Sequence, residues 1–507
     1  MCFFVVKYWY IVEVCSMYVK RNKEELKQLK VISIEDLVPQ DHILRQIEAS
    51  IDFSFIYDEV KGLYSEIEWG KPGIDPVSLF KIVFIQYLFG IRSMRQTIKE
   101  IEVNMAYRWF IGYDLNEKVP HFSTFGKNYT RRFKDTDVFE KIFKHILEEA
   151  IRVGFVDTSA VFIDGTHIKA SANKRKAIKA LVDVQAKNYQ EQLESEIHKD
   201  REEHNKKPLK NKNTDDDNNP PAPETKEIKQ STTDPESGVF HKGEHEKCFA
   251  YVANTACDKN NFVLDFVLGA GNIHDSVMFD GLYKKVIDKF PETEVIAVDS
   301  GYKTPWIMKQ IIDSARIPAV PYKRPMTKKG FFRKHEYVYD EYYDCIICPN
   351  NQILKYSTTN RDGYREYKSN PYICEKCDKI NECTQSKNHQ KVVTRHLWEN
   401  YIEIAEDYRH TPKYRDIYKL RSETIERVFA DAKEKHGMRY TQLRGLEKVK
   451  MQVMLTFACM NLKKLASWKK KNGLLSPNFY YFLIGILKNA LSFEKINILT
   501  KKAALPC

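Results

Sequence analysis

The chain has 507 residues, enough for two to four structural units, and this length excludes a miniature fold that depends on disulfide bonds, although eleven cysteines are present. Its formal net charge of +12 fits a polyanionic partner but is weak evidence by itself. The apolar segment 1–20 is interrupted by Lys7 and Glu13, and no basic segment precedes it. We therefore expect residues 1–30 to be a tail on a soluble, cytoplasmic protein rather than a membrane anchor.

Residues 31–150 have the pattern of a helical region. Apolar residues recur at helical spacing in 76–91, a segment that begins with proline. Residues 121–133 are expected to form a short helix that carries Lys127 and Arg131. Short helices with a basic, aromatic-rich last member suit a helix-turn-helix reader of duplex DNA. An ordinary helical bundle with a solvated basic face would give the same pattern.

From residue 151 the pattern changes to that of an α/β domain, which we place at 151–470. An apolar run predicts a buried strand at 159–164 that ends in Asp164. The elements expected after it are strands at 248–258 and 262–270, a helix at 274–290, a strand at 294–300, a helix at 304–315, a strand at 317–323 and helices from 412 to 470. This order indicates a layered α/β architecture.

Two insertions interrupt this domain. Residues 174–240 combine a charged, helix-prone stretch with a loop of disordered composition. Residues 328–398 contain five cysteines. After the domain, residues 471–507 are expected to form an apolar helix with a loose tail.

The clustered cysteines have the spacing of metal ligands. Cys345 and Cys348 form one C-x2-C pair, and Cys374 and Cys377 form a second, after a spacer slightly longer than is usual. Because two such pairs complete a closed tetrahedral site, the spacing predicts one structural Zn²⁺. Cys383 is either a substitute ligand or a spare, and unbound thiols are the alternative.

Three acidic residues stand in settings that suit metal-dependent phosphodiester chemistry. Asp164 and Asp299 each close a run too apolar for a surface edge, and ligands gather at the carboxyl ends of strands in α/β sheets. Glu426 lies on a predicted helix whose apolar stripe would pack on the sheet, with Lys433 on an adjoining face. Each acid taken singly fits a turn or a solvated charge better, so the prediction rests on the combination. Glu423 is the rival third carboxylate.

Around these acids the sequence resembles the DDE transposases of bacterial insertion sequences. The matching segments are IDGTHIKASANK at Asp164, AVDSGY at Asp299 and IERVFADAKEKHGMR at Glu426, and the resemblance covers most of residues 31–467. It implies a ribonuclease H-like mixed sheet flanked by helices, an N-terminal helical DNA-binding domain and a cysteine-rich insertion. The chain is similar to the branch with a Tyr-Arg-Glu-Lys signature, in which Tyr418 and Arg421 would take the first two positions. Arg421 lies five residues before Glu426, one more than that signature has.

The resemblance implies a transposase that binds the terminal inverted repeats of its own element, hydrolyses the ends and joins their 3′-OH groups to target DNA. Asp164, Asp299 and Glu426 would hold two Mg²⁺ or Mn²⁺ ions. The candidate DNA contacts are Lys433, Lys169, Arg421, Tyr418, Lys127 and Arg131. The implied partners are double-stranded DNA and a second copy of the chain, with no membrane, at a nucleoid-associated place in the cytoplasm.

Two other classes of protein fit parts of the pattern. A zinc-containing DNA-binding regulator without enzymatic activity would use the N-terminal helices and the cysteines, and would not need the three acids. A ribonuclease H-like nuclease would hydrolyse DNA without joining strands.

Overall fold

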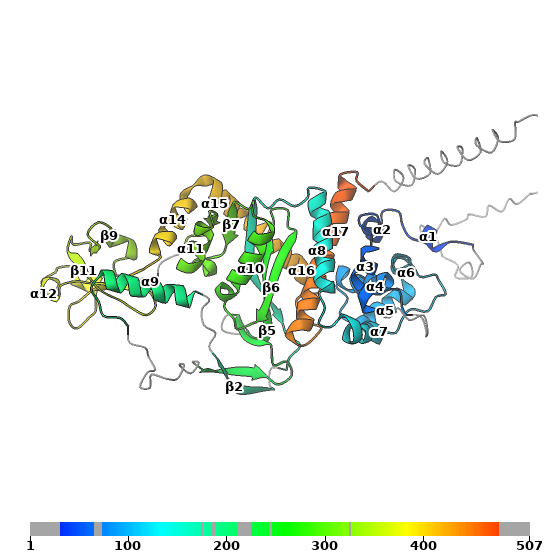
Figure 1. Ribbon diagram of the computed structural model, residues 1–507, viewed down its shortest axis with the longest axis horizontal. Helices are drawn as coiled ribbons and strands as arrows, with labels where there is room; N and C mark the ends of the chain where they lie inside the picture. Colours follow the sequence, from blue (N-terminus) through cyan, green and yellow to red (C-terminus); the bar gives the residue numbers. More distant parts are fainter. Residues whose placement is uncertain are drawn as a thin grey trace, which may run out of the picture.

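The computed structural model describes residues 31–64, 73–173, 176–183, 189–209, 225–242, 246–323 and 326–475. The predicted tail 1–30, the predicted C-terminal helix beyond residue 475 and the loop 210–224 lie outside the described residues. The described part is elongated, with the N-terminal helices at one end, a mixed sheet in the middle and a smaller sheet at the other end (Figure 1).

A six-stranded mixed sheet forms the centre of the described structure. Its strands are β1 (Ala160–Lys169), β4 (Gly238–Lys242), β5 (Glu246–Cys257), β6 (Val263–Ala270), β7 (Val295–Val298) and β8 (Ile317–Ala319). β5 is antiparallel to β1 on one side, whereas β7 and then β8 follow in parallel on the other. The outer edge of β5 pairs with β4 along its first half and with β6 along its second. The predicted mixed α/β architecture is confirmed.

β1 is longer than the sequence predicts. The expectation that the strand ends in Asp164 is wrong, because β1 continues to Lys169. β7 stops at Val298, opposite Ile163, but β5 pairs with β1 as far as Lys169. The polar half of β1 therefore keeps its main-chain hydrogen bonds on one edge, and Asp164 lies inside the strand where one neighbour ends.

Helices surround this sheet. They are α10 (Asp275–Lys289), α11 (Pro305–Asp313), α14 (Glu399–His410), α15 (Pro412–Lys419), α16 (Ile425–Glu434) and α17 (Leu446–Lys471). α10 packs on β5 and β6, α15 on β7 and β8, and α16 on β1 and β5. Thr304 begins α11 by accepting a hydrogen bond from the Ile307 amide, as the Thr-Pro start predicts.

The N-terminal region is helical, as expected. Its helices are α1 (Ile34–Leu37), α2 (Ile43–Glu48), α3 (Phe55–Val60), α4 (Pro76–Leu88), α5 (Met94–Val103), α6 (Met105–Ile111), α7 (Ser123–Asn128) and α8 (Val138–Arg152). α4 is buried at every position from Leu79 to Leu88, so it forms the centre of this bundle.

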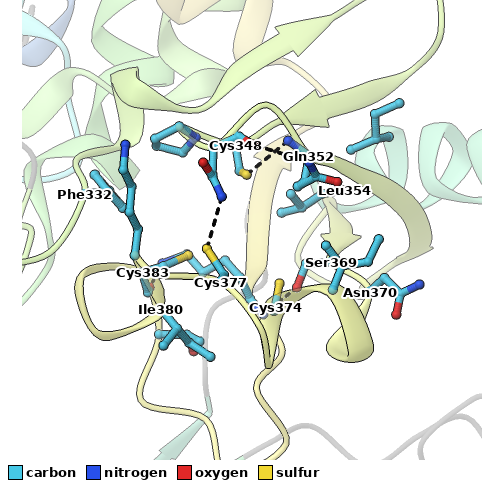
Figure 2. Close-up of a pocket in the computed structure, with 17 residues that line it drawn as sticks. Phe332, Cys348, Gln352, Leu354, Ser369, Asn370, Cys374, Cys377, Ile380 and Cys383 are labelled. Carbon is cyan, nitrogen blue, oxygen red and sulfur yellow. Dashed lines mark hydrogen bonds between the residues drawn. The ribbon is translucent and has the colours of Figure 1, made fainter.

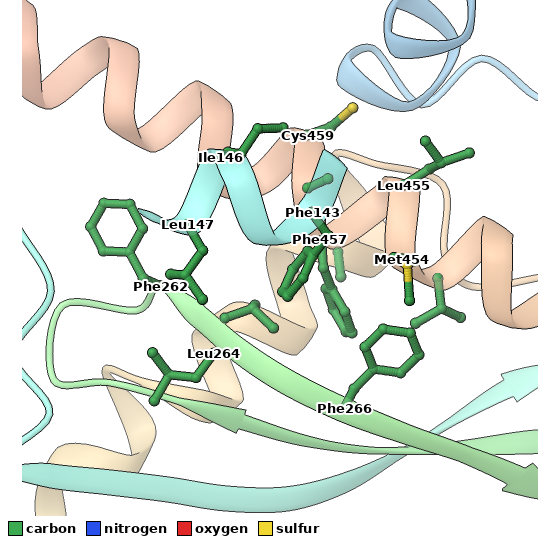
Figure 3. Close-up of a cluster of buried hydrophobic side chains, with 14 of the residues drawn as sticks. Phe143, Ile146, Leu147, Phe262, Leu264, Phe266, Met454, Leu455, Phe457 and Cys459 are labelled. Atoms are coloured by element: carbon green, nitrogen blue, oxygen red, sulfur yellow. The ribbon is translucent and has the colours of Figure 1, made fainter. Parts of the chain in front are cut away.

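α8 and α17 join the bundle to the sheet (Figure 1). Phe143 and Leu147 of α8 meet Phe457 of α17 in one apolar cluster, into which Phe266 of β6 also points (Figure 3). The rings of Phe266 and Phe457 lie edge to face, with centroids 5.4 Å apart. One continuous core therefore underlies the helical bundle and the sheet.

The first insertion differs from its prediction. Residues 177–183 form β2 (Ala177–Asp183) instead of a helix, and β2 pairs antiparallel with β3 (Thr225–Ser231). Helix propensity at these residues is a weak preference that strand pairing overrides. Within the same charged stretch, α9 (Gln190–Glu203) is helical, as predicted.

The second insertion folds into a five-stranded antiparallel sheet in which neighbouring strands are consecutive in the chain. Its elements are β9 (Val338–Asp340), β10 (Cys345–Ile347), β11 (Ile353–Thr359), β12 (Tyr364–Lys368), α12 (Pro371–Cys374), α13 (Ile380–Cys383) and β13 (Val392–His396). Asp200 of α9 accepts a 2.7 Å hydrogen bond from Nε of Arg365 in β12, so the two insertions pack on each other. We call residues 328–398 the cysteine-rich module.

Candidate active site

Asp164 and Asp299 lie at the same level on neighbouring parallel strands. Ile163 of β1 is the register partner of Val298, the last residue of β7, and an aspartate follows each. The amide of Gly165 donates to Asp164 Oδ1 at 2.8 Å, and the amide of Ser300 donates to Asp299 Oδ1 at 2.5 Å. Both aspartates are half-buried. The parallel register thus brings together two acids that are far apart in the sequence.

Arg421 contacts Asp164 directly. Its Nη2 donates to Asp164 Oδ2 at 2.6 Å, and its Nη1 donates to the carbonyl of Ile163 at 3.4 Å. The guanidinium lies over the ring of Tyr418, 5.7 Å from the centroid. Because Arg421 is only 5% exposed, it is placed to compensate the charge of Asp164 rather than to reach outward to DNA.

Glu426 extends from the first turn of α16. Its apolar neighbours Ile425, Val428 and Phe429 are buried, which confirms the predicted stripe, whereas Glu426 is exposed. The predicted helix thus leaves the carboxyl group of Glu426 accessible.

The phenol of Tyr418 lies within electrostatic reach of all three acids. Burial is the main cause that raises the pKa of Tyr418, Arg421 opposes it, and Asp299, Glu426 and Asp164 each raise it further. The three carboxylates therefore lie in the neighbourhood of one tyrosine, although they come from β1, from the residue after β7 and from α16.

Glu423 faces other surroundings. It precedes α16, and its carbonyl accepts a 2.9 Å hydrogen bond from Nδ2 of Asn261. It lines an open groove of about 680 Å³ together with Arg427, Lys463 and Lys464. It is not among the carboxylates that act on Tyr418.

Carboxylate oxygens are the ligands that hard divalent cations prefer, so the donor chemistry of the three acids fits Mg²⁺ or Mn²⁺. Within the described ranges, no three histidine, cysteine, aspartate or glutamate side chains already form a group that could hold a metal ion. The Arg421 guanidinium supplies positive charge at Asp164 Oδ2. The residue types at the site therefore suit a divalent cation, although their side chains are not arranged as a complete coordination shell.

Two predicted basic residues flank the far half of β1. The pKa of His167 is lowered to about 4. Burial of the imidazole is the larger cause, and the positive charge of nearby Lys433 also lowers the pKa. Lys169 lies over the ring of Tyr440, 5.6 Å from the centroid, and its main chain bonds to residues 439 and 441. Lys433 and Lys169 are thus held near the segment that follows Asp164.

The other predicted DNA contacts are far from the carboxylates. Lys127 is on α7 and Arg131 is in the π-helical turn after it, and both are exposed. α7 lies in the N-terminal bundle, beyond α17 as seen from the sheet (Figure 1).

Two protein-family models match the chain. A transposase domain (DUF772) matches residues 32–131, and a transposase DDE domain matches residues 347–466. Together these matches support a DDE transposase of an insertion sequence. The second match includes Glu426 and Lys433, whereas Asp164 and Asp299 both lie outside the two matches.

Neither the curated proteins nor the solved structures yielded a match to this transposase. Transposases act on DNA, so the two matches support DNA as the partner. Among its described helices, none combines the length and the apolar character needed to cross a membrane.

Proposed function

We propose that this transposase hydrolyses the phosphodiester bonds at the ends of its own element and joins the freed 3′-OH groups to target DNA, with Asp164, Asp299 and Glu426 as its catalytic carboxylates. The parallel register of β1 and β7 carries the proposal, because it sets two carboxylates side by side where the strands part. The strand order β6, β5, β1, β7, β8, antiparallel and then parallel about β1, supports a ribonuclease H-like domain.

The acids would hold two Mg²⁺ or Mn²⁺ ions, which activate the attacking oxygen and stabilise the leaving 3′ oxygen when bound. Arg421 fixes the carboxylate of Asp164, and Tyr418 stays protonated because its pKa is raised, so its O–H can donate to a phosphate oxygen. Lys433 and Lys169 are placed to neutralise phosphates beside the site.

The N-terminal bundle, with Lys127 and Arg131 exposed, would bind the terminal inverted repeats. A second copy of the chain is expected in the DNA complex, because two element ends must be joined together. Because its substrate would be chromosomal DNA, we expect the protein to be associated with the nucleoid. The regulator and the joining-deficient nuclease remain outcomes of the following test.

The test uses labelled duplex DNA that carries the flanks of the gene for this chain, with Mg²⁺ and with EDTA. Asp164→Asn and Glu426→Gln should lower cleavage and strand transfer by more than about 100-fold, since even residues that only support metal ligands cost about 10–100-fold. Glu423→Gln is the matched control, because Glu423 is three residues from Glu426 but faces the groove. Its activity should stay within a few-fold of wild type.

DNA binding is measured for every variant by gel shift, so that a folding defect is recognised. Equal losses in Glu423→Gln and Glu426→Gln would remove Glu426 from the catalytic set. Binding without cleavage by the wild type would favour the regulator, and hydrolysis without joining would favour the nuclease.

A further inference from the structure

Four cysteines of the cysteine-rich module line one small cavity. They are Cys348, Cys374, Cys377 and Cys383, and they point into the cavity from three separate segments (Figure 2). The cavity holds about 30 Å³, which is room for about one small occupant. It lies in the sheet at the opposite end of the molecule from the N-terminal helices (Figure 1).

Main-chain and side-chain donors already point at two of these sulfur atoms. The amide of Gln352 donates to Cys348 Sγ at 3.4 Å, across a turn in which the Cys348 amide donates to the Gln352 carbonyl at 2.9 Å. Nδ2 of Asn350 donates to Cys377 Sγ at 3.4 Å. Donors aimed at sulfur favour the thiolate, which is the form that binds metals.

Cys383 belongs to the same group. Its Sγ lies 3.2 Å from the hydroxyl group of Tyr337. Cys383 lines the same cavity as Cys348, Cys374 and Cys377.

Cys345 stands apart from this group. It begins β10, is buried and does not line the cavity. Burial, Asp340 and Asp344 raise its pKa, with no cysteine among the causes. β10 ends at Ile347, so Cys345 is held in the strand whereas Cys348 lies in the turn beyond it.

The apolar core of the module itself is small. Its own core consists of the buried side chains Tyr337, Ile346, Leu354 and Tyr367. Apolar cores this small usually need a disulfide or a metal ion to be stable. The cysteines of the module are free thiols in the structure, so a bound metal ion, rather than a disulfide bond, is the cross-link that they could form.

We propose that Cys348, Cys374, Cys377 and Cys383 bind one structural Zn²⁺ that holds the cysteine-rich module together. Four thiolates make a closed tetrahedral zinc site, which has no open position for catalysis. The ligand set differs from the sequence prediction in one member, Cys383 in place of Cys345. The four side chains are all described, and they do not yet stand at the mutual distances of a bound ion, so binding must draw the sulfur atoms together.

Metal content of the purified full-length protein is the first measurement. Elemental analysis should find one Zn²⁺ per chain in the wild type and in Cys345→Ala, and none in Cys383→Ala or Cys374→Ala. Cys345→Ala is the matched control, because it removes a buried thiol from the same sheet without touching the cavity.

Cobalt substitution gives a second readout that does not depend on DNA cleavage. Co²⁺ should produce the intense sulfur-to-metal charge-transfer absorption of thiolate ligands in the wild type and in Cys345→Ala. If Cys383→Ala does not fold, Cys383→His tests the same position, because imidazole also binds zinc. That variant should keep the metal with a shifted and weaker absorption.

Three results would overturn the proposal. Zinc lost from Cys345→Ala but kept in Cys383→Ala would restore the ligand set predicted from spacing. Iron in place of zinc would replace the proposed metal by an iron–sulfur cluster. A wild-type protein that takes up neither zinc nor cobalt would leave the four cysteines as unligated thiols. None of these results bears on the catalytic carboxylates, so failure here and failure of the proposed transposition chemistry are separable.

Discussion

Arg421 is the residue that most directly sets the charge of the candidate active site. Its guanidinium donates to Asp164. Asp299 and Glu426 place two further negative charges near Tyr418, as Asp164 does. Carboxylates this close destabilise one another unless a cation compensates them. In the structure this cation is the arginine.

Arg421→Gln should lower stability in EDTA by about 1–3 kcal/mol, less than the full cost of breaking a buried ion pair, because the Asp164 side chain is still 20% exposed. A loss of 1 kcal/mol shifts the melting temperature by roughly 2–4 °C in large domains. Mg²⁺ should raise the melting temperature of the variant more than that of the wild type, because a cation at the carboxylates restores the missing charge. Thermal unfolding with and without Mg²⁺ measures both effects.

Arg427→Gln is the control for this substitution. Arg427 is also close to Glu426 in the chain, but it is exposed and lines the groove beside Glu423. It should melt like the wild type under both conditions. An Arg421→Gln protein as stable as wild type in EDTA would show that the ion pair does not hold the site.

The sequence predicts single residues well where their local setting is distinctive, and poorly where a contact is long-range. Asp164 and Asp299 are recognisable because buried strands leave apolar runs before them. The contact of Arg421 with Asp164 joins residues 257 positions apart and leaves no trace in local spacing. The regular C-x2-C spacing of Cys345 likewise gives no sign that this residue is buried in a strand.

At the scale of elements, the position of α16 depends on a close contact with the end of α4. Gly90, just after α4, approaches the main chain of residues 435–437, just after α16. The Nδ1–H of His436 donates to the carbonyl of Tyr87 at 2.8 Å across the same contact. Because α16 carries Glu426, this contact connects the N-terminal bundle to the candidate active site.

Gly90→Ala tests that connection against Gly112→Ala. Both glycines have positive φ, +62° and +80°, so each alanine costs about 1–2 kcal/mol of backbone strain. Only at Gly90 would the new Cβ also meet a backbone atom, the carbonyl oxygen of Lys435 at 2.8 Å. Overpacking should add about 1–3 kcal/mol there. Chemical denaturation of the two variants gives the difference directly.

Gly90→Ala should also reduce strand cleavage, because the displaced loop moves α16. Gly112→Ala should cut DNA at close to the wild-type rate, since nothing lies within 4 Å of its Cβ position. Equal losses of stability in the two proteins would mean that α4 and the turn after α16 separate without cost.

Most element types were predictable from hydrophobic period, but the type of β2 and the extent of β1 depended on neighbouring strands. α10 and α11 match their predicted ranges closely. β1 continues past its apolar run because β5 continues beside it, and β2 forms because β3 is available to pair. The hydrophobic periodicity of a segment indicates which face each residue occupies. It does not indicate over how many residues a neighbouring strand pairs with the segment.

At the scale of the whole molecule, three separate apolar clusters divide the described residues unequally, and the smallest consists of Leu193, Ile197 and Trp398. The large core is shared by the N-terminal bundle and the mixed sheet, whereas the cysteine-rich module has its own small one. The sequence predicted the module as an insertion. It did not predict that α17 would join the bundle to the sheet, because a helix that is buried on most sides shows no apolar stripe from which its packing partners could be inferred.

A pair of core substitutions should reveal this division. Phe457→Ala removes a fully buried ring from α17 and should cost about 3–5 kcal/mol. Its effect should appear as faster amide hydrogen exchange in α4 and in β1 together, because both rest on the shared core. Leu354→Ala, in β11, should cost about 2–5 kcal/mol and speed exchange only within residues 328–398 and α9, which packs on that sheet.

If Phe457→Ala loosened the sheet and left α4 protected, the bundle would be an independently stable domain. Catalysis at Glu426 would then depend on the bundle only through the Gly90 contact and not through a common core.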